Sequence, residues 1–224
     1  MIRPPSLRSP LLVRRAGAVV AVVGALVALA QLPTTSAAFT AATANAGNSF
    51  ASAGTWCTTP GAATTTVQND TMLAQDDPDG NYGGAVQISV RSQAGGNRDV
   101  LVRPSLPAVP PGCDITSATL RFRVVSFTGG RTYQARRATT PWDVFAVTWS
   151  SRPSTTGPAT TAMTTNTTWE IDITPQVQAI VAAGPGQNHG VLISDTVPDA
   201  SPSRTNTYDT LDGTTPAVVD YAWG

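Results

Sequence analysis

Short segments in which apolar and polar residues alternate recur through residues 85–222, and Gly, Pro and Ser residues separate them. The clearest is 118–125, where Leu120 and Phe122 alternate with Thr119, Arg121 and Arg123. Neighbouring side chains of a β-strand point to opposite faces, so this pattern places one face on a core and leaves the arginines in solvent. The alternation restricts the chain to a fold built mainly from half-buried strands.

Composition refines this expectation. Apolar residues make up 41% of the chain and charged residues 12%, and 19 glycines and 18 prolines break it into short pieces. This composition favours an all-β fold, an antiparallel, jelly-roll-like β-sandwich with many turns. Besides 118–125, strands are expected at 85–91, 99–103, 132–138, 145–149, 167–173, 189–195 and 217–222.

One short helix should interrupt the strands. Thr174 suits the N-cap, Pro175 suits the first helical position, and Gly184 can end the helix. Val177, Ile180 and Val181 then form an apolar stripe that can cover one end of the sandwich.

The first 38 residues have the three parts of a secretory signal. A basic start ends at Arg14 and Arg15, a 17-residue apolar run follows at 16–32, and small residues lead to Ala38. An uncleaved membrane anchor is the alternative, because the apolar run approaches the length that spans a bilayer. Residues 39–66, rich in Ala, Thr, Gly and Ser, should form a flexible segment, and 67–224 should form the sandwich domain.

Export would place the two cysteines in an oxidising compartment. Cys57 and Cys113 are the only cysteines, and an even number in an oxidising compartment favours a disulfide. Two buried free thiols are the alternative. With one histidine far from either cysteine, the spacing offers no zinc site.

The charge of the chain excludes one class of partner. The chain contains no lysine, and beyond residue 38 ten arginines face fourteen acidic residues. A mildly acidic domain is a poor binder of nucleic acids. Membrane contact is expected only through an uncleaved leader.

No catalytic centre is evident. His189 is the sole histidine, and no serine lies in a G-x-S-x-G turn. Glu170 and Asp172 lie two apart on one predicted strand, whereas glycosidases hold their two carboxylates across a cleft. The chain is expected not to be an enzyme.

The basic residues suggest a ligand. No acidic residue occurs between Asp114 and Asp143, and Arg121, Arg123 and Arg136 would point outward from two candidate strands. If those strands are neighbours, the three side chains form a cationic strip, and guanidinium groups match carboxylates. An anionic polysaccharide of uronic-acid type is the expected partner, and a solvated outer face is the alternative.

Two further groups of residues are candidates for binding. Asp76, Asp77, Asp79 and Asn81 place several oxygen ligands close together, which a structural calcium ion requires, although a solvated turn has the same composition. Tyr208 lies outside the predicted strands and should be exposed, where its ring could stack on a sugar.

Five segments together resemble one known family. They are 70–83, 101–124, 142–153, 169–181 and 190–194, and in this order they resemble the DNRLRE domain, also described as the family-96 carbohydrate-binding module. That domain is found attached to secreted bacterial enzymes and surface proteins. The resemblance covers residues 68–222. It implies a β-sandwich that binds glycans such as alginate, with Trp142, Trp149 and Trp169 as packing residues.

These observations together predict a secreted, extracellular, non-catalytic carbohydrate-binding domain at the cell envelope, with structural calcium as the only cofactor considered. The alternative is a structural protein of the cell surface or biofilm matrix without glycan specificity.

Overall fold

A computed structural model describes residues 56–184 and 186–224. The expected leader and most of the expected flexible segment lie outside the described residues. Nearly all regular structure is antiparallel strand, and one helix occurs among the described residues, as the sequence predicts. The elements are β1 (Gly61–Ala74), β2 (Gln87–Ser92), β3 (Arg98–Pro104), β4 (Ile115–Phe127), β5 (Thr132–Ala138), β6 (Thr155–Met163), β7 (Thr168–Asp172), α2 (Thr174–Ala183), β8 (Val191–Asp195), β9 (Arg204–Asp209) and β10 (Val218–Trp223).

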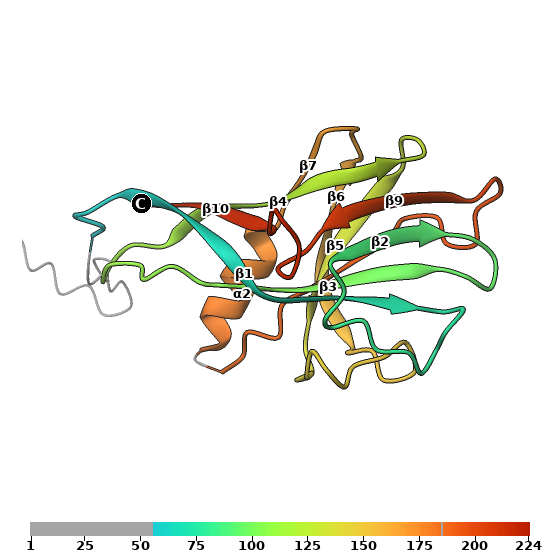
Figure 1. The fold of residues 1–224 in the computed structure, drawn as a ribbon. Helices are drawn as coiled ribbons and strands as arrows, with labels where there is room; N and C mark the ends of the chain where they lie inside the picture. The colour runs from blue at the N-terminus through green and yellow to red at the C-terminus, as the bar shows by residue number, and fades with distance from the viewer. Residues whose placement is uncertain (1–55, 185) are drawn as a thin grey trace, which may run out of the picture. The chain divides into compact units, whose positions relative to one another are not determined.

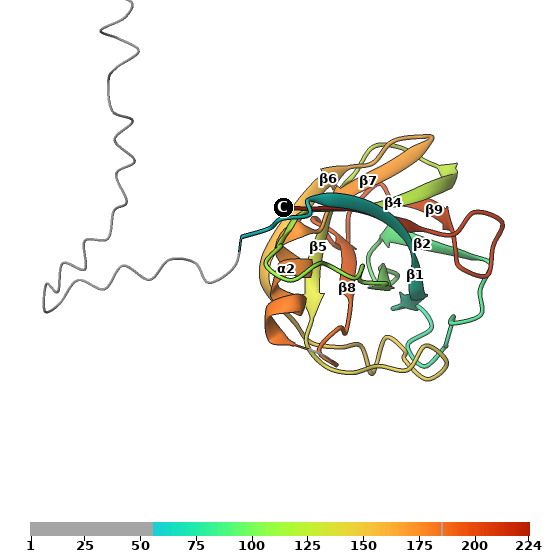
Figure 2. The same cartoon turned by 90° about the vertical axis from the view of Figure 1, so that its left-hand side faces the viewer.

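Two long strands close the sheet on itself. The first part of β1 pairs with β10, and after a register shift at Val67 the rest pairs with β3. The start of β4 likewise pairs with β10, and its last residues pair with β9 across a register shift at Val124. The ring β1–β10–β4–β9–β2–β3 therefore forms a six-stranded barrel, and Figure 2 shows the strands around a common interior. The expected sandwich of two separate sheets is replaced by this barrel, because bulged strands that change partner turn the corners between sheets.

Further elements extend the barrel (Figure 1). Strands β8, β5 and β6 continue the sheet from β3, and β7 pairs with β4. Helix α2 packs against β4, β5 and β6 through Val177 and Ile180, which are buried. Val181, expected on the same stripe, is 50% exposed. No helix within 56–184 or 186–224 is long and apolar enough to span a membrane.

Four aromatic side chains form the centre of the core. Phe122, Tyr133, Trp169 and Tyr208 are each at most 1% exposed, and their ring centroids lie 5.3 to 5.7 Å apart in the four contacting pairs. Each large apolar side chain buried in this way contributes about 1.5–3 kcal/mol to folding. The burial of Trp169 agrees with its expected packing role. Tyr208 was expected to be exposed, and that expectation is wrong.

The helix begins differently from its expected cap. Ile173 occupies the N-cap position, and no side chain there bonds the helix. The Thr174 hydroxyl instead accepts the Ala118 N–H at 2.8 Å, and Asp172 accepts the Thr174 N–H at 2.8 Å. Thr174 therefore ties the start of the helix to β4.

The strand boundaries differ from expectation at several places. Residues 145–149 form a turn, because the Asp143 side chain accepts the Phe145 N–H at 2.8 Å and its carbonyl accepts the Val147 N–H at 2.8 Å. Strands β1, β6 and β9 were not predicted. Strand β1 begins at Gly61, within the segment expected to be flexible, so the domain starts before residue 67.

The expected disulfide is present. Cys57 is bonded to Cys113, 56 residues later. The bond joins the stretch before β1 to the loop that leads into β4.

Replacing Cys57 and Cys113 together with serine should lower the free energy of unfolding by about 4 kcal/mol, because the loop they close no longer restricts the unfolded chain. Urea unfolding followed by tryptophan fluorescence measures the change. The parent protein in reducing buffer should unfold at the same urea concentration as the variant. Equal midpoints for the variant and the oxidised parent would contradict the prediction.

Candidate functional site

Arg121 and Arg123 lie on the outer face of β4, alternating with the buried Phe122. An Arg121 Nη2 group pairs with Asp220 on β10. The Arg123 Nη1 group donates to Asp209 and to the Thr214 hydroxyl, each at 3.2 Å. The Arg123 side chain remains 53% exposed. Both guanidinium groups are held in place by carboxylates without being covered.

A shallow cavity of ≈ 450 Å³ lies beside these two arginines. Its walls come from β4, from the start of β7, and from the segment that leads into β10. No acidic residue lines it. The lining residues are Arg121, Arg123, Thr167, Thr168, Thr215, Pro216 and Val218.

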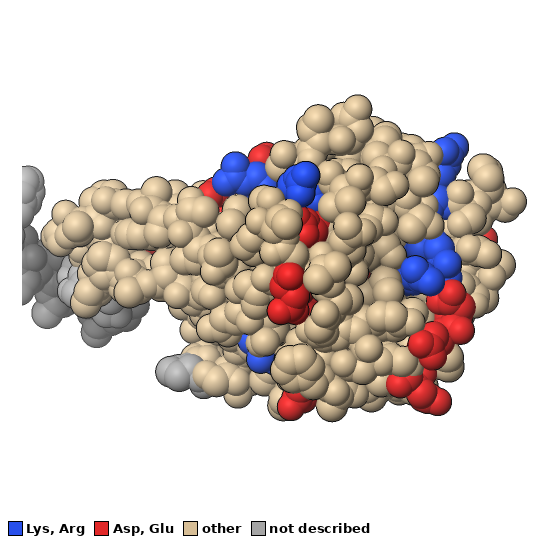
Figure 3. Space-filling model, viewed as in Figure 1, with Lys and Arg blue, Asp and Glu red and all other residues tan. Residues whose placement is uncertain are grey.

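Arg136 does not join this pair. It lies on β5, which is paired with β8 and β6, whereas β4 is paired with β10, β9 and β7. The expected cationic strip of three arginines is therefore wrong, because it assumed that strands consecutive in sequence are neighbours. Figure 3 shows the arginines of one face lying beside acidic side chains rather than in a single patch.

Tyr208 cannot present a ring to a ligand, since it is enclosed in the core beside Phe122 and Trp169. Its burial follows from the position of β9, which lies between β4 and β2 in the barrel. Trp142 is buried as expected. Trp149 is only half-buried and lines a cavity.

The residues proposed for calcium have partners within the protein. Asp76 pairs with Arg91 at 2.7 Å and with Arg98 at 3.2 Å, and these contacts hold the pKa of its carboxyl at about 2. Asp77 accepts the Tyr82 hydroxyl at 2.9 Å. Asp79 is exposed. Across residues 56–184 and 186–224, no three acidic, histidine or cysteine side chains form a group that could hold a metal.

Asn81 has a role that its sequence context did not suggest. Its amide nitrogen donates to the Val144 carbonyl at 2.9 Å and to the Val147 carbonyl at 2.8 Å. The Ser150 N–H also donates to the Pro78 carbonyl at 2.9 Å. The connection between β1 and β2 thereby fixes the loop 139–154.

The other side of this loop is fixed to the sheet. The Trp142 Nε1 group donates to the His189 carbonyl at 2.7 Å. Arg103 donates to the Trp142 carbonyl at 2.8 Å and lies over the indole ring at 4.4 Å. Together with Leu101 on β3, Trp142 belongs to a small apolar cluster under the loop.

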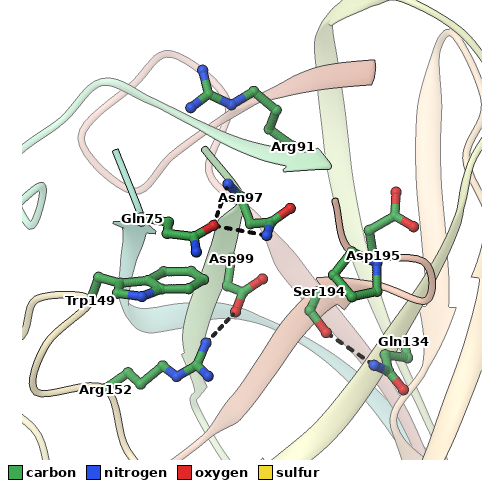
Figure 4. A pocket seen from close by; sticks show the side chains of 10 residues that line it. Gln75, Arg91, Asn97, Asp99, Gln134, Trp149, Arg152, Ser194 and Asp195 are labelled. Atoms are coloured by element: carbon green, nitrogen blue, oxygen red, sulfur yellow. Dashed lines mark hydrogen bonds and ion pairs between the residues drawn. The ribbon is translucent and has the colours of Figure 1, made fainter. Parts of the chain in front are cut away.

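A second cavity, of ≈ 340 Å³, opens where this loop meets the sheet (Figure 4). Gln75, Trp149, Asp99 and Arg152 lie on one side in this view, and Ser194 and Gln134 lie on the other. Arg91, Asn97, Asp195 and Pro198 complete the lining. The sequence did not reveal this cavity, because its residues come from six separate segments. The one local signal was Trp149, which the sequence assigned to packing.

Asp99 is the most perturbed group in this cavity. It is 7% exposed, and the single hydrogen bond of its side chain among the described residues comes from Arg152 at 3.4 Å. Burial raises its pKa to about 7 by disfavouring the charged carboxylate; the Arg152 charge acts in the opposite direction and Asp195 adds to the rise. Arg152 in turn lies over the Trp149 ring at 4.5 Å.

The pKa of Asp99 predicts how stability depends on pH. In the folded state Asp99 stays protonated at pH values where the same carboxyl of the unfolded chain has lost its proton. The free energy of unfolding is therefore highest below the ordinary pKa of 3.8, and it declines as the pH rises to about 7. Asp99→Asn should therefore reduce the decline of the free energy of unfolding over this range by up to about 4 kcal/mol. Urea unfolding at several pH values measures it.

Asp114→Asn is the matched control, because Asp114 is exposed and its replacement should leave the decline unchanged. A residual decline is expected in the Asp99 variant, since burial also raises the pKa of Asp70 to about 6. Parallel pH profiles for the parent and the Asp99 variant would show that the prediction is wrong.

Comparison with known proteins identifies the family. A search of curated proteins found no match to this chain. The sequence profile of carbohydrate-binding module family 96 matches residues 61–209, from the first residue of β1 to the last residue of β9. The matched segment covers more than half of the 224 residues. The match includes every strand that lines either cavity except β10. The chain belongs to carbohydrate-binding module family 96.

Proposed function

We propose that this chain is a secreted, non-catalytic module that binds an acidic polysaccharide of uronic-acid type at the cell envelope, through the cavity beside Arg121 and Arg123. The observation that carries the proposal is the lining of that cavity, which contains two guanidinium groups and no carboxylate. Family membership supports a carbohydrate ligand. The composition of residues 1–38 supports export.

The two arginines keep hydrogen-bonding capacity for a ligand. A guanidinium group carries five N–H donors, and within the described residues Arg123 uses only Nη1. The Arg121 Nε atom is buried, and Nη2 pairs with Asp220, which leaves Nη1 of Arg121 for a ligand. A sugar carboxylate could accept two parallel hydrogen bonds from Nε and Nη2 of Arg123.

The strand geometry suits an extended polymer. Alternate residues of a strand are about 6.7 Å apart on the same face, so Arg121 and Arg123 can each meet a different sugar residue. Thr168 lies opposite Arg123 on β7, and Thr167 and Thr215 also line the cavity. Their hydroxyl groups can bond sugar hydroxyls along the chain.

The acidic residues of β7 support a non-catalytic role. Glu170 and Asp172 lie on the same exposed face of one strand rather than across a cleft. Asp172 accepts the backbone N–H of Thr174, and Glu170 lies opposite Arg121 in the strand register. His189 contributes its carbonyl to the Trp142 indole.

Replacing Arg121 and Arg123 together with glutamine should weaken binding to alginate or polygalacturonate by about 1–3 kcal/mol, because charge-assisted hydrogen bonds are lost. Binding by the parent should exceed its binding to neutral glucans and should weaken as salt rises, since exposed charges are screened over about 8 Å at physiological ionic strength. Isothermal titration calorimetry at two salt concentrations measures both effects.

Arg136→Gln is the matched control, because Arg136 lies on β5, away from β4 in the strand order. It should bind the acidic polymers as the parent does. A folded double variant with the affinity of the parent would place the site elsewhere. If the parent binds no glycan at all, the alternative of a structural surface or matrix protein takes its place.

We further propose that the turn between β1 and β2 binds a structural calcium ion, with Asp77 and Asp79 as carboxylate ligands. A chelator should then lower the melting temperature, and calcium added in excess of the chelator should restore it by mass action. Asp79→Asn should remove this response, since it deletes one ligand of an exposed turn. A melting temperature that does not change with millimolar chelator would exclude the ion.

A further inference from the structure

We propose that the cavity between Trp149, Asp99 and Gln134 is a second glycan site, which takes a single neutral pyranose residue and is chemically distinct from the arginine site on β4. Its volume of ≈ 340 Å³ lies in the range of pockets that hold small ligands, about 300–1,000 Å³. The inference rests on the side chains of this cavity and does not require the acidic-polysaccharide site.

The floor and walls of the cavity are fixed in advance. Gln134 on β5 donates to the Ser194 hydroxyl on β8 at 3.2 Å, which forms one side. On the opposite side, Gln75 Oε1 accepts two N–H groups of Asn97, from the backbone at 3.0 Å and from the side chain at 2.8 Å. A ligand would therefore meet side chains that are already oriented, which lowers the entropy lost on binding.

The aromatic wall is equally constrained. Trp149 belongs to the loop 139–154, which Asn81 fixes through the Val144 and Val147 carbonyls. Arg152 covers one face of its ring, with Cζ 4.5 Å from the centroid, and the ring also packs against the small apolar cluster under the loop. The part of the indole that lines the cavity offers an apolar surface for the C–H groups of a sugar, beside partners for its hydroxyls.

Several polar atoms in the cavity lack a protein partner. Among the described residues, Gln75 Nε2 and Gln134 Oε1 make no hydrogen bond, and neither does Asp99 Oδ1. Asp99 is more than nine-tenths buried, and a buried carboxylate with one long hydrogen bond is costly. These atoms supply one donor and two acceptors to the lining of the cavity, which can bond the hydroxyls of a sugar.

The charges of the cavity favour a neutral ligand. Neither arginine in its lining is open to an anion: the Arg91 side chain is only 15% exposed and bonds Asp76 and the Gly96 carbonyl. Arg152 is held between the Asp99 carboxyl and the Trp149 ring. Figure 4 shows Arg91 extending away from Asp99 and Arg152. Asp195 is already paired with Arg131 at 2.7 Å, so the acidic group left for a ligand is the buried Asp99, which would oppose a second carboxylate and can instead bond a sugar hydroxyl.

The test uses the full chain and defined probes. The methyl glycosides of glucose, galactose and mannose, together with cellotetraose, mannotetraose and xylotetraose, are screened by saturation-transfer NMR, and any that bind are titrated by calorimetry. At least one neutral probe should bind. Gln134→Ala should weaken that binding about fivefold, and Asp99→Asn should weaken it tenfold or more, following the usual strengths of neutral and charged hydrogen bonds.

Gln68→Ala is the matched control, because Gln68 is exposed on β1 and makes no side-chain contact with the cavity. It should bind the neutral probe as the parent does. Trp149→Phe should remove the change in tryptophan fluorescence that accompanies binding. If this variant does not fold, the Gln134 and Asp99 variants still decide the question, and melting temperatures verify that each is folded.

The outcomes separate this site from the arginine site. The proposal predicts that the Arg121 and Arg123 variant keeps its affinity for the neutral probe, and that Gln134→Ala keeps its affinity for alginate. The proposal is overturned if no neutral probe binds the parent, if the cavity variants bind as tightly as the parent, or if only the arginine variant loses the neutral probe.

Discussion

The backbone hydrogen bonds of β1 and β4 determine the whole architecture. Each strand is longer than its neighbours, with 14 and 13 residues, and pairs with different partners along its length. A strand that changes partner leaves no open edge where the two sheets meet, and so the buried N–H and C=O groups on both sides of the corner are satisfied. Closure also encloses the aromatic cluster around Phe122. The outward face of β4 then carries the arginine cavity, and the Trp149 cavity lies against β3, β5 and β8.

The sequence predicted the individual strands better than their arrangement. Alternation identified β4, β5 and β8 because each has one face on the core. β6 is mostly exposed and contains Gly157 and Pro158, so it carries no periodic signal. Strand partners depend on contacts between residues far apart in sequence, which alternation does not encode. That is why the barrel closure and the separation of β5 from β4 were not predicted.

The candidate sites show the same limit. Arg121 and Arg123 could be found because two outward positions of one strand are fixed by local geometry. Tyr208 was misplaced because β9 is rich in Thr, Asn and Asp, which hides the fact that Tyr208 faces the core. The cavity around Asp99 could not be predicted, since it depends on how the loop 139–154 lies on the sheet. Asn81 holds this loop in place, whereas the sequence suggests that Asn81 is a cation ligand.

The positions at which the chain enters and leaves the domain have a consequence for attachment. Gly61 is paired with Trp223, Asp114 exchanges two backbone hydrogen bonds with Gly224, and the disulfide joins Cys57 to the residue before Asp114. Gln75, by contrast, follows directly on Ala74, where β1 ends. In Figure 1 β1 runs toward the opposite end of the barrel. A tether joined ahead of Trp56 would therefore hold the domain by one end. The Trp149 cavity, which Gln75 lines, lies toward the other end of the described domain, so such a tether would leave it uncovered.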